Sequence, residues 1–549
     1  MSTIPIIPES APFSSEQRSW LNGFLAGILS RGTAGGAPSM DNSTAVKPKL
    51  LVLFGSQSGN AEGYSKKLCK EAIARGFQAR VAGLETLEPE ELKSEQHVLV
   101  ITSTWGEGDM PDNAVSFWDK LNQNGSSPKL EGLKFSVLAL GDMNYGDTFC
   151  LAGRKLDQRF EELGAQRIHP RVDCDVDYDD LAKTWSEGVF LTLLDPSSSN
   201  GGATTAPVTV ETEIETGYTR KNPFPAPLLA SIALNGERSA KDTRHVSFSL
   251  EGSGLVYETG DALGLFPENC PEVVADIIAT HELDANAIVH LHNGSEAPLH
   301  EALLKYYEIR SLIGKTPEAN VSPADFVSSL RKLQPRLYSI ASSLKAHPNE
   351  VHLCVGAVRY EKDGQQHKGV ASTFLADRLA VGGTAGVFVH TAKHFRVPAD
   401  GKTPIIMVGP GTGIAPFRAF LEERQISGAT GHNWLFFGDQ KRSTDFLYHD
   451  QILSWVKDGH LTRLDTAFSR DQAEKIYVQD RMLSAASELW SWLEHGAYFY
   501  VCGDASRMAK DVDTALHTIV QQQGGKSEDE AAAYVAEMKK SKRYARDVY

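Results

Sequence analysis

The chain has 549 residues, too many for a single hydrophobic core, and this length predicts three or four domains. Its 55 basic and 70 acidic residues give a formal net charge of −15, which disfavours nucleic-acid binding and suits basic protein partners. The six cysteines form no C-x-x-C pair, so we expect no disulfide framework and no metal site. No signal peptide is visible, and the most apolar N-terminal stretch, residues 20–29, is about half the length of a membrane-spanning helix. A cytoplasmic protein is therefore expected.

An amphipathic helix is predicted near the N-terminus. Trp20, Phe24 and Ile28 recur every four residues within 14–30, which places them on one face of a helix. Such an apolar stripe suits contact between copies of the chain, so a homo-oligomer through this helix is a further expectation.

Three modules are predicted after this helix. Apolar strands alternate with helical stretches in the first and third modules, as in a doubly wound parallel sheet, whereas the second is rich in β-strands. Runs of Gly, Ser and Pro mark the linkers. The predicted segments are an N-terminal helix and linker over 1–49, a first module over 50–194, a linker over 195–207, a β-rich module over 208–402 with a helical insertion at about 268–332, and an α/β module over 403–549.

Three loops of the first module suit a flavin mononucleotide. Residues 56–61, SQSGNA, lie between a strand and a helix and offer hydroxyl, amide and backbone N–H groups to a phosphate. This stretch has no lysine, so it is not a nucleotide P-loop, and an ordinary polar turn is the alternative. Trp105 and Tyr145 follow two later strands, at the edge where doubly wound sheets bind ligands, and two aromatic rings there can enclose a planar ring. Together the three loops predict FMN.

Two motifs of the β-rich module indicate a second flavin. Arg336, Tyr338 and Ser339 place a cation, an aromatic ring and a hydroxyl on one strand. Residues 369–372, GVAS, open a helix whose first N–H groups suit a pyrophosphate. The first motif alone is also compatible with an ordinary half-buried strand, but the pair predicts FAD.

The third module carries the features of a nicotinamide nucleotide site. A glycine-rich turn over 409–416 joins a strand to a helix, with proline where the Rossmann pattern has its last glycine. Proline suits the first turn of a helix because its missing N–H costs nothing there. Ser469, Arg470, Lys475 and Tyr477 follow a later strand, and cations at this place favour the 2′-phosphate of NADPH over NADH. A solvated charged turn is the alternative.

The order of these motifs resembles the diflavin reductase family, in which a flavodoxin-type FMN domain precedes a ferredoxin–NADP reductase module. The flavoprotein subunits of NADPH-dependent sulfite reductases are the most similar branch, and that resemblance extends to the N-terminal helix. It implies an α/β multidomain fold, with a flavodoxin-like doubly wound parallel sheet, an antiparallel β-barrel with a helical insertion, and an α/β NADP-binding domain. One departure is that Arg310, in a distinctly short insertion, stands where the family often has a threonine that contacts FAD.

The resemblance also implies site residues. The residues expected at FMN are Ser56, Gln57, Ser58, Gly59, Asn60, Ala61, Ser103, Thr104, Trp105, Gly106, Leu140, Gly141, Asp142, Tyr145 and Cys150. Those expected at FAD are Arg336, Leu337, Tyr338, Ser339, Cys354, Val355, Gly356, Tyr360, Gly369, Val370, Ala371, Ser372 and Tyr549. Those expected at NADPH are Gly409, Gly411, Thr412, Gly413, Ser469, Arg470, Lys475, Tyr477, Gln479 and Asp511. The implied hydride-transfer site consists of Ser339, Cys502, Asp547 and Tyr549.

The reaction implied by the resemblance passes electrons from NADPH to FAD, then to FMN, and then to an external metal-containing partner. The first expectation is a sulfite reductase beta subunit with sirohaem and an iron–sulfur cluster, which reduces sulfite to sulfide for cysteine biosynthesis. One alternative is a soluble NADPH–haemoprotein reductase of the cytochrome P450 type. A non-enzymatic FMN electron carrier is disfavoured because every expected hydride-site residue is present.

Two features raise separate hypotheses. The last residue, Tyr549, is either the end of a frayed tail or, as the resemblance implies, a ring that covers FAD and yields to nicotinamide. Residues 173–180 carry five aspartates, which form either a solvated acidic face or a surface that steers a basic redox partner.

Overall fold

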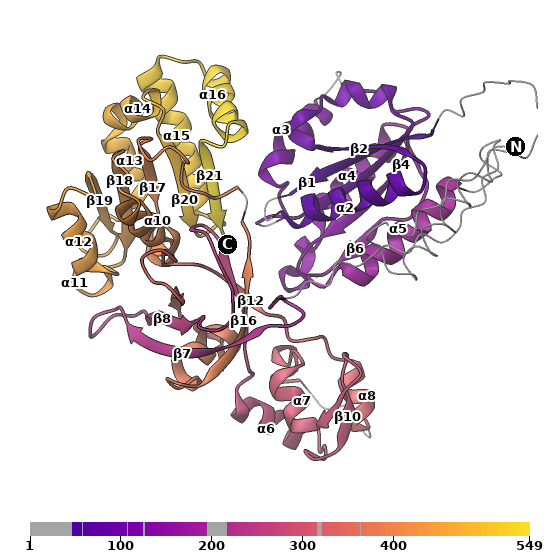
Figure 1. Ribbon diagram of the computed structural model, residues 1–549, viewed down its shortest axis with the longest axis horizontal. Coiled ribbons are helices and arrows are strands. Elements are labelled where there is room, and N and C mark those ends of the chain that lie inside the picture. Colours follow the sequence, from indigo (N-terminus) through magenta and orange to yellow (C-terminus); the bar gives the residue numbers. More distant parts are fainter. Residues whose placement is uncertain are drawn as a thin grey trace, which may run out of the picture. The chain divides into compact units, whose positions relative to one another are not determined.

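The computed structural model describes residues 47–56, 59–106, 108–123, 127–194, 217–315, 321–362, 364–392 and 394–549 (Figure 1). The expected helix over 14–30 and the linker over 195–207 lie outside the described residues. Gln57 and Ser58 of the expected phosphate loop also lie outside them.

The first module is a parallel sheet with helices on both faces. Its strands are nearly continuous apolar runs because both faces are covered. Helices α2 and α5 pack on one face, and α3 and α4 pack on the other. The strands, in order across the sheet, are β2 (Gln78–Gly83), β1 (Lys49–Gly55), β3 (His97–Ser103), β4 (Lys134–Leu140) and β5 (Gln166–Arg167), and β6 (Val172–Cys174) also pairs with β4. The helices are α2 (Asn60–Ala74), α3 (Asp112–Leu121), α4 (Leu151–Glu162) and α5 (Asp179–Leu194).

The second module is an antiparallel barrel. Six strands form one sheet, and the bridge between Ile340 and Leu353 joins its two ends, so the sheet closes around a core of its own. The strands, in order, are β12 (Arg336–Ser339), β9 (Ala262–Phe266), β16 (Thr384–His390), β7 (Phe224–Ala233), β8 (Thr243–Ser249) and β13 (Glu350–Gly356). A hairpin of β14 (Arg359–Lys362) and β15 (Gln365–Lys368) leads into the short helix α9 (Val370–Thr373).

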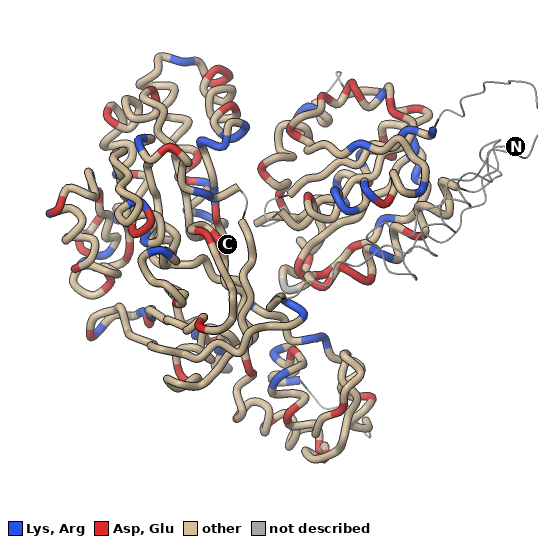
Figure 2. The backbone as a smooth tube through the Cα atoms, viewed as in Figure 1, with Lys and Arg blue, Asp and Glu red and all other residues tan. Residues whose placement is uncertain are grey.

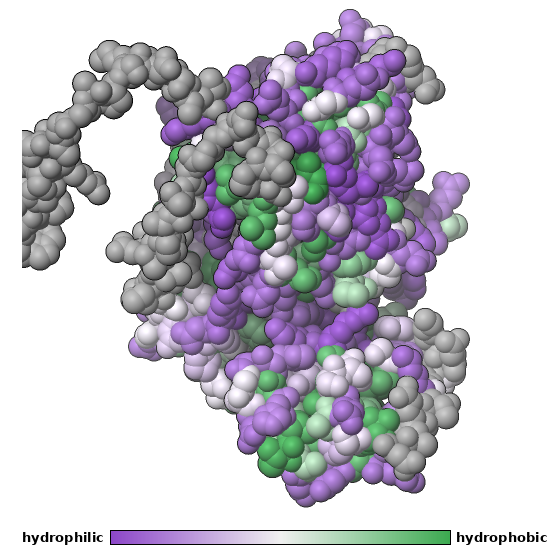
Figure 3. All heavy atoms as spheres, turned by 90° about the vertical axis from the view of Figure 1, so that its right-hand side faces the viewer, coloured by the Kyte–Doolittle hydropathy of each residue, from purple (hydrophilic) through white to green (hydrophobic). Residues whose placement is uncertain are grey.

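The insertion between β9 and β12 has its own small apolar core. It is mainly helical but also contains a hairpin, and on the face shown in Figure 3 apolar side chains lie in small groups among hydrophilic ones. Its elements are α6 (Pro271–Thr280), β10 (Ile288–His290), β11 (Glu296–Pro298), α7 (Leu299–Lys305) and α8 (Pro323–Ser328).

The third module is a second parallel sheet. Alternate residues of its central strand enter opposite cores, so α10 and α12 cover one face while α13 to α16 cover the other. The strands, in order, are β19 (Arg463–Phe468), β18 (Asn433–Asp439), β17 (Ile405–Val408), β20 (Tyr498–Gly503) and β21 (Tyr544–Val548). The helices are α10 (Ala415–Ile426), α11 (Arg442–Asp445), α12 (His449–Lys457), α13 (Val478–Ser484), α14 (Ala486–Glu494), α15 (Met508–Gly524) and α16 (Glu528–Lys540). These three architectures confirm the predicted fold class.

A buried polar network joins the barrel to α10 of the third module. The guanidinium of Arg418 donates to the carbonyl of Ala341 and pairs with Glu422 at 2.7 Å. Glu422 also accepts a hydrogen bond from the backbone N–H of Ser343. A buried charge is tolerated only where it is paired in this way, so the network fixes the barrel against the sheet. Among the helices of the described ranges, none is long and apolar enough to cross a membrane.

Candidate functional site

The expected FMN loops lie together at the carboxyl edge of the first sheet. Gly59 adopts φ +90° at the N-cap of α2, and its N–H donates to the hydroxyl of Ser56 at 3.0 Å. The N–H of Ser56 donates in turn to Asn113 at 2.8 Å. Among the described residues, a Cβ added at Gly59 would meet no atom within 4 Å, and the first N–H groups of a helix have no partner within the helix itself. This cradle fits a phosphate.

Two aromatic residues stand beside this cradle. Trp105 is held by a backbone bridge to Asp109, and Tyr145 lies in the turn after β4 with 57% of its surface exposed. An exposed aromatic ring at a ligand-binding edge is free to stack on a planar group. The expected residues that line the cavity here are Asn60, Ser103, Thr104, Trp105, Gly106, Leu140, Gly141, Asp142, Tyr145 and Cys150.

Cys150 reaches this cavity only through its backbone. Its thiol is fully buried and faces the carbonyl oxygens of Ala139 and Cys174 at 3.4 and 3.5 Å. Burial raises the pKa of this thiol to about 12, so it stays protonated. Ala61 is likewise fully buried, and its place in the phosphate loop rests on its backbone.

The acidic stretch of residues 173–180 is largely engaged by other groups. Asp173 pairs with Arg154 and Arg171, and Asp177 pairs with Arg220 at 2.7 Å. Figure 2 shows the acidic residues gathered just before α5. Asp179 also pairs with Lys221 at 3.2 Å, so three of the five aspartates have cationic partners, which leaves less free charge to steer a basic redox partner.

Most of the expected FAD residues line a large cavity, about 2550 Å³, whose walls come from all three modules. Arg336 is anchored by a hydrogen bond to the carbonyl of Gln334 at 2.9 Å, so its guanidinium is oriented before any ligand arrives. The first turn of α9 opens onto the same cavity. The expected residues that line it are Arg336, Leu337, Tyr338, Ser339, Cys354, Gly356, Gly369, Val370, Ala371 and Ser372.

Two expected FAD residues lie elsewhere. Val355 is buried in the barrel core, and Tyr360 stacks on His367 within the β14–β15 hairpin at a ring distance of 5.1 Å. Arg310, by contrast, lines the cavity. It binds both carboxylate oxygens of Glu308, which lies 3.6 Å from Arg336. The position that departs from the family pattern therefore adds a second guanidinium here.

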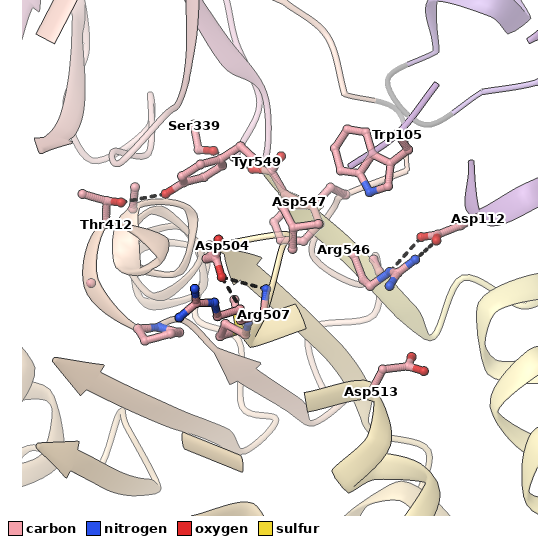
Figure 4. Close-up of a pocket in the computed structure, with 18 of the residues that line it drawn as sticks. Trp105, Asp112, Ser339, Thr412, Asp504, Arg507, Asp513, Arg546, Asp547 and Tyr549 are labelled. Carbon is pink, nitrogen blue, oxygen red and sulfur yellow. Dashed lines mark hydrogen bonds and ion pairs between the residues drawn. The ribbon is translucent and has the colours of Figure 1, made fainter. Parts of the chain in front are cut away.

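The expected hydride-transfer residues converge on one carboxylate. Ser339 donates its hydroxyl hydrogen bond to Asp547 at 2.5 Å, and both residues are labelled in Figure 4. The thiol of Cys502 lies 3.8 Å from the same oxygen. Cys502 and Asp547 are direct neighbours in the β20–β21 register. Burial raises the pKa of Asp547, opposed by the bond from Ser339. Burial and the charge of Asp547 also hold the pKa of Cys502 well above its usual range, so this thiol is a neutral donor.

Tyr549 continues the strand that carries Asp547. Its N–H donates to the carbonyl of Gly503 and its carbonyl accepts from Ala505, both at 3.0 Å. The hydroxyl bonds to Thr412 at 2.8 Å, and 56% of the residue remains exposed (Figure 4). The backbone is thus held on both sides, and the ring is the part that can turn.

The glycine-rich turn between β17 and α10 packs closely against neighbouring backbone. A Cβ on Gly413 would lie 2.1 Å from the carbonyl oxygen of Cys502, and one on Gly409 would lie 2.5 Å from the carbonyl of Gly413. Only glycine fits at these two positions. Gly411 adopts φ +57° and, with Thr412, lines the cavity. The turn fits the phosphates of a dinucleotide and sets Cys502 beside it.

The residues after β19 are brought to the same cavity only in part. The expected residues that line it are Ser469, Tyr477, Gln479 and Asp511, whereas Arg470 and Lys475 are exposed outside its lining. Arg507 lines it as well and was not expected from the sequence (Figure 4). The signal that could have found Arg507 is its place just after β20, since ligand-binding residues follow the strands of such a sheet.

One further cluster could coordinate a metal within the described residues: His347, Glu350 and His352. The Nδ1 atom of His352 faces the guanidinium of Arg418 at 3.5 Å, and His347 bonds to Glu422 at 3.2 Å. These partners belong to the polar network between the barrel and α10. A cationic neighbour and occupied ring nitrogens suit a structural hydrogen-bond network better than a cation site.

The structure combines a flavodoxin-like phosphate cradle, a barrel with a second flavin cavity, and a nucleotide turn beside the buried cluster of Ser339, Asp547 and Cys502. Together these features define an NADPH-dependent diflavin reductase. Family models agree in the same order. The flavodoxin model matches residues 52–187, the FAD binding domain model matches 217–305 and 294–374, and the oxidoreductase NAD-binding domain model matches 407–514.

Relatives match the chain over its whole length. It is 46% identical to the sulfite reductase [NADPH] flavoprotein alpha-component of Bacillus subtilis, an alignment that covers 100% of this chain and 96% of the relative. The protein of the same name from Vibrio cholerae is 42% identical over 98% of this chain and 94% of its own length. That from Neisseria meningitidis is 38% identical over 100% and 99%. The chain belongs to the sulfite reductase [NADPH] flavoprotein alpha-component family, and its cofactors are FMN, FAD and NADPH.

Proposed function

We propose that this chain is the electron-supplying component of an assimilatory sulfite reductase, which reduces sulfite to sulfide. The names of relatives that match it over nearly their whole length support this proposal. The observation that carries the electron-supply role is the convergence of Ser339 and Cys502 on Asp547, beside the nucleotide turn and in the same chain as a flavodoxin-like module. When bound, FAD accepts a hydride from NADPH and FMN passes electrons on singly.

The roles proposed for the chain's residues follow from their placement. Arg336 and the first turn of α9 hold the phosphates of FAD, while the cradle around Gly59 holds that of FMN. Asp547 fixes the hydroxyl of Ser339 and keeps Cys502 neutral, so the site offers donors of fixed direction without a thiolate that would attack the ring. The ring of Tyr549, which lines the cavity, would cover the flavin and turn away when nicotinamide binds. The predicted domain boundaries at 50–194, 208–402 and 403–549 remain part of this proposal.

The partner we propose is a separate subunit with sirohaem and an iron–sulfur cluster. The relatives are named as alpha-components, which supports the existence of a second component. We place the pair in the cytoplasm because NADPH is the donor and all six cysteines are unpaired, as is usual in a reducing compartment. Assembly of several copies through the helix over 14–30 is also part of the proposal.

The test is a reconstitution with purified components. The chain loaded with FAD and FMN should oxidise NADPH with ferricyanide as acceptor. Adding a sirohaem and iron–sulfur sulfite reductase subunit should then give NADPH oxidation that depends on sulfite and yields sulfide. Reduction of a haem monooxygenase without any sulfide formation would instead favour the haemoprotein reductase, and no oxidation of NADPH with ferricyanide would contradict both.

A further inference from the structure

An ion pair between Lys241 and Asp439 joins the barrel to the nucleotide-binding sheet. Lys241 lies in the turn between β7 and β8, and Asp439 ends β18. The ammonium group donates to Oδ1 of Asp439 at 2.5 Å. The carboxylate is fully buried, whereas the lysine side chain is 37% exposed. Both residues line the large cavity.

Hydrogen bonds hold the turn that carries Lys241 against the third module. Asn235 and Ser239 both donate to the carboxylate of Asp445 at the end of α11. The N–H of Gly236 donates to the carbonyl of Thr444 at 2.7 Å. The ammonium of Lys241 is therefore placed by the fold and is not simply a mobile surface charge.

The second oxygen of Asp439 is unsatisfied and lies at the glycine turn. Among the described residues, its Oδ2 atom is buried without a hydrogen-bond partner. A Cβ on Gly411 would lie 3.8 Å from this oxygen and 3.9 Å from the nitrogen of Lys241. Such an orphan oxygen is costly in a native structure and calls for a functional explanation. The pair thus faces the place where the turn presents its backbone to nucleotide phosphates.

We propose that Lys241, a residue of the barrel, binds the pyrophosphate of the nicotinamide nucleotide. Asp439 is then a buried counter-charge that competes for the lysine and limits this binding. The inference rests on the NADPH binding of the proposed function and adds a residue to it. In the free protein Lys241 pairs with Asp439. In the complex the ammonium is shared between the carboxylate and a phosphate.

The physical reason is competition for one cation. A carboxylate next to a pyrophosphate repels it, and it also keeps part of the lysine charge for itself. Burial raises the pKa of Asp439, and the bond from Lys241 opposes that shift. An arrangement that weakens product binding suits an enzyme that must release NADP⁺ in every cycle.

Lys241 should act on both nicotinamide nucleotides alike. The pyrophosphate is common to NADPH and NADH, whereas only NADPH carries the 2′-phosphate expected at Arg470. The roles of Lys241 and Arg470 can therefore be distinguished by experiment. Loss of Lys241 should weaken both nucleotides, and loss of Arg470 should weaken NADPH alone.

The first test replaces Lys241 in the full chain loaded with both flavins. For Lys241→Met we expect KM to rise about 10- to 100-fold for NADPH and for NADH, with kcat for ferricyanide within about twofold of wild type. The Kd of NADP⁺ from titration calorimetry should rise by the same factor. Lys241→Arg should restore most of the affinity, and Lys457→Met, an exposed lysine at the end of α12, is the matched control.

The second test replaces Asp439, and we expect the opposite effect on nucleotide affinity. Asp439→Asn should lower the Kd of NADP⁺ about 3- to 10-fold, because it frees the lysine. The double variant Lys241→Met with Asp439→Asn removes the buried unpaired charge and so protects the fold. It should bind NADP⁺ at least about 10-fold more weakly than Asp439→Asn alone.

Unchanged KM values in Lys241→Met, or equal weakening by both single variants, would overturn the inference and leave a purely structural ion pair. A wild-type protein that oxidises NADPH while the variants behave in this way contradicts the inference alone. A wild-type protein that does not oxidise NADPH contradicts the proposed function itself.

Discussion

The FMN cradle and the hydride-transfer cluster are built in opposite ways. The cradle consists of loops that each directly follow a strand of one sheet, so all of its parts belong to a single module. The cluster instead joins Ser339 of the barrel to Asp547 of the third module, 208 residues apart in sequence. The first site depends on local backbone conformation and the second on the packing of two modules, so they should fail in different ways.

The largest effect is expected at the centre of the hydride cluster. Asp547→Asn removes the charged acceptor shared by Ser339 and Cys502, and we expect kcat for NADPH oxidation to fall by about 10²-fold or more. Stopped-flow reduction of the flavin measures this, and both flavins should stay bound. Asp450→Asn, at a fully exposed carboxylate of α12, is the control. Loss of FAD from the Asp547 variant would show a binding role instead.

The second-largest effect distinguishes the 2′-phosphate of NADPH from the pyrophosphate that NADPH and NADH share. Arg470→Ala should raise KM for NADPH about 10- to 100-fold through loss of a charged hydrogen bond, with KM for NADH nearly unchanged. Steady-state kinetics with both nucleotides checks this, and NADH serves as the internal control. Equal weakening of both would place the 2′-phosphate elsewhere, since Arg470 is exposed outside the cavity lining.

The independence of the FMN cradle can be tested with a substitution that strains its backbone. Gly59→Ala forces a side chain into φ +90°, at a cost of about 1–2 kcal/mol, so FMN should be retained roughly 5- to 30-fold less tightly. Flavin content after dialysis measures this, and FAD should stay bound. Gly76→Ala introduces a similar strain at φ +95° beyond the far end of α2 and should release neither flavin. Joint loss of both flavins from the Gly59 variant would contradict the independence of the two sites.

A smaller effect concerns the ring of Tyr549. Tyr549→Ala keeps the backbone bonds to Gly503 and Ala505 but opens the flavin face, so the Kd of NADP⁺ should fall about 3- to 10-fold and use of NADH should improve. Tyr549→Phe removes only the hydroxyl contact to Thr412 and should act in the same direction, more weakly. Unchanged nicotinamide binding in both variants would leave the ring without a gating role.

The smallest effect is on stability against pH. The pKa of Asp547 is raised in the folded protein, so the native state binds more protons than the unfolded state between the unfolded value of about 3.9 and the raised value. The free energy of unfolding should therefore fall as pH rises through that window, and Asp547→Asn should flatten this part of the profile. Denaturant melts at several pH values test it, and an unchanged slope would contradict the burial of this charge.

The same contrast explains what the sequence could predict. Motifs that follow a strand, such as Trp105 and Ser469, were found because a doubly wound sheet sends such residues to one edge. Tyr360 was expected in a flavin site, but the hairpin turns its ring onto His367, outside the cavity lining. Lys241 and Asp439 carry no signal at all, since a lysine in a polar turn and an aspartate at a strand end are both common. The two residues meet only because the barrel packs against the third module.

The buried network around Arg418 has a consequence for how such a gene can be recombined. Arg418 and Glu422 hold the barrel at Ala341 and Ser343, so a crossover between the barrel and the third module would join halves that do not match at a buried charge. A crossover between residues 194 and 217 instead separates pairs that are more exposed, such as Asp177 with Arg220 and Asp112 with Arg546. Flavodoxin halves should therefore be exchanged among relatives at a smaller cost than the barrel and the nucleotide sheet, which should be inherited together.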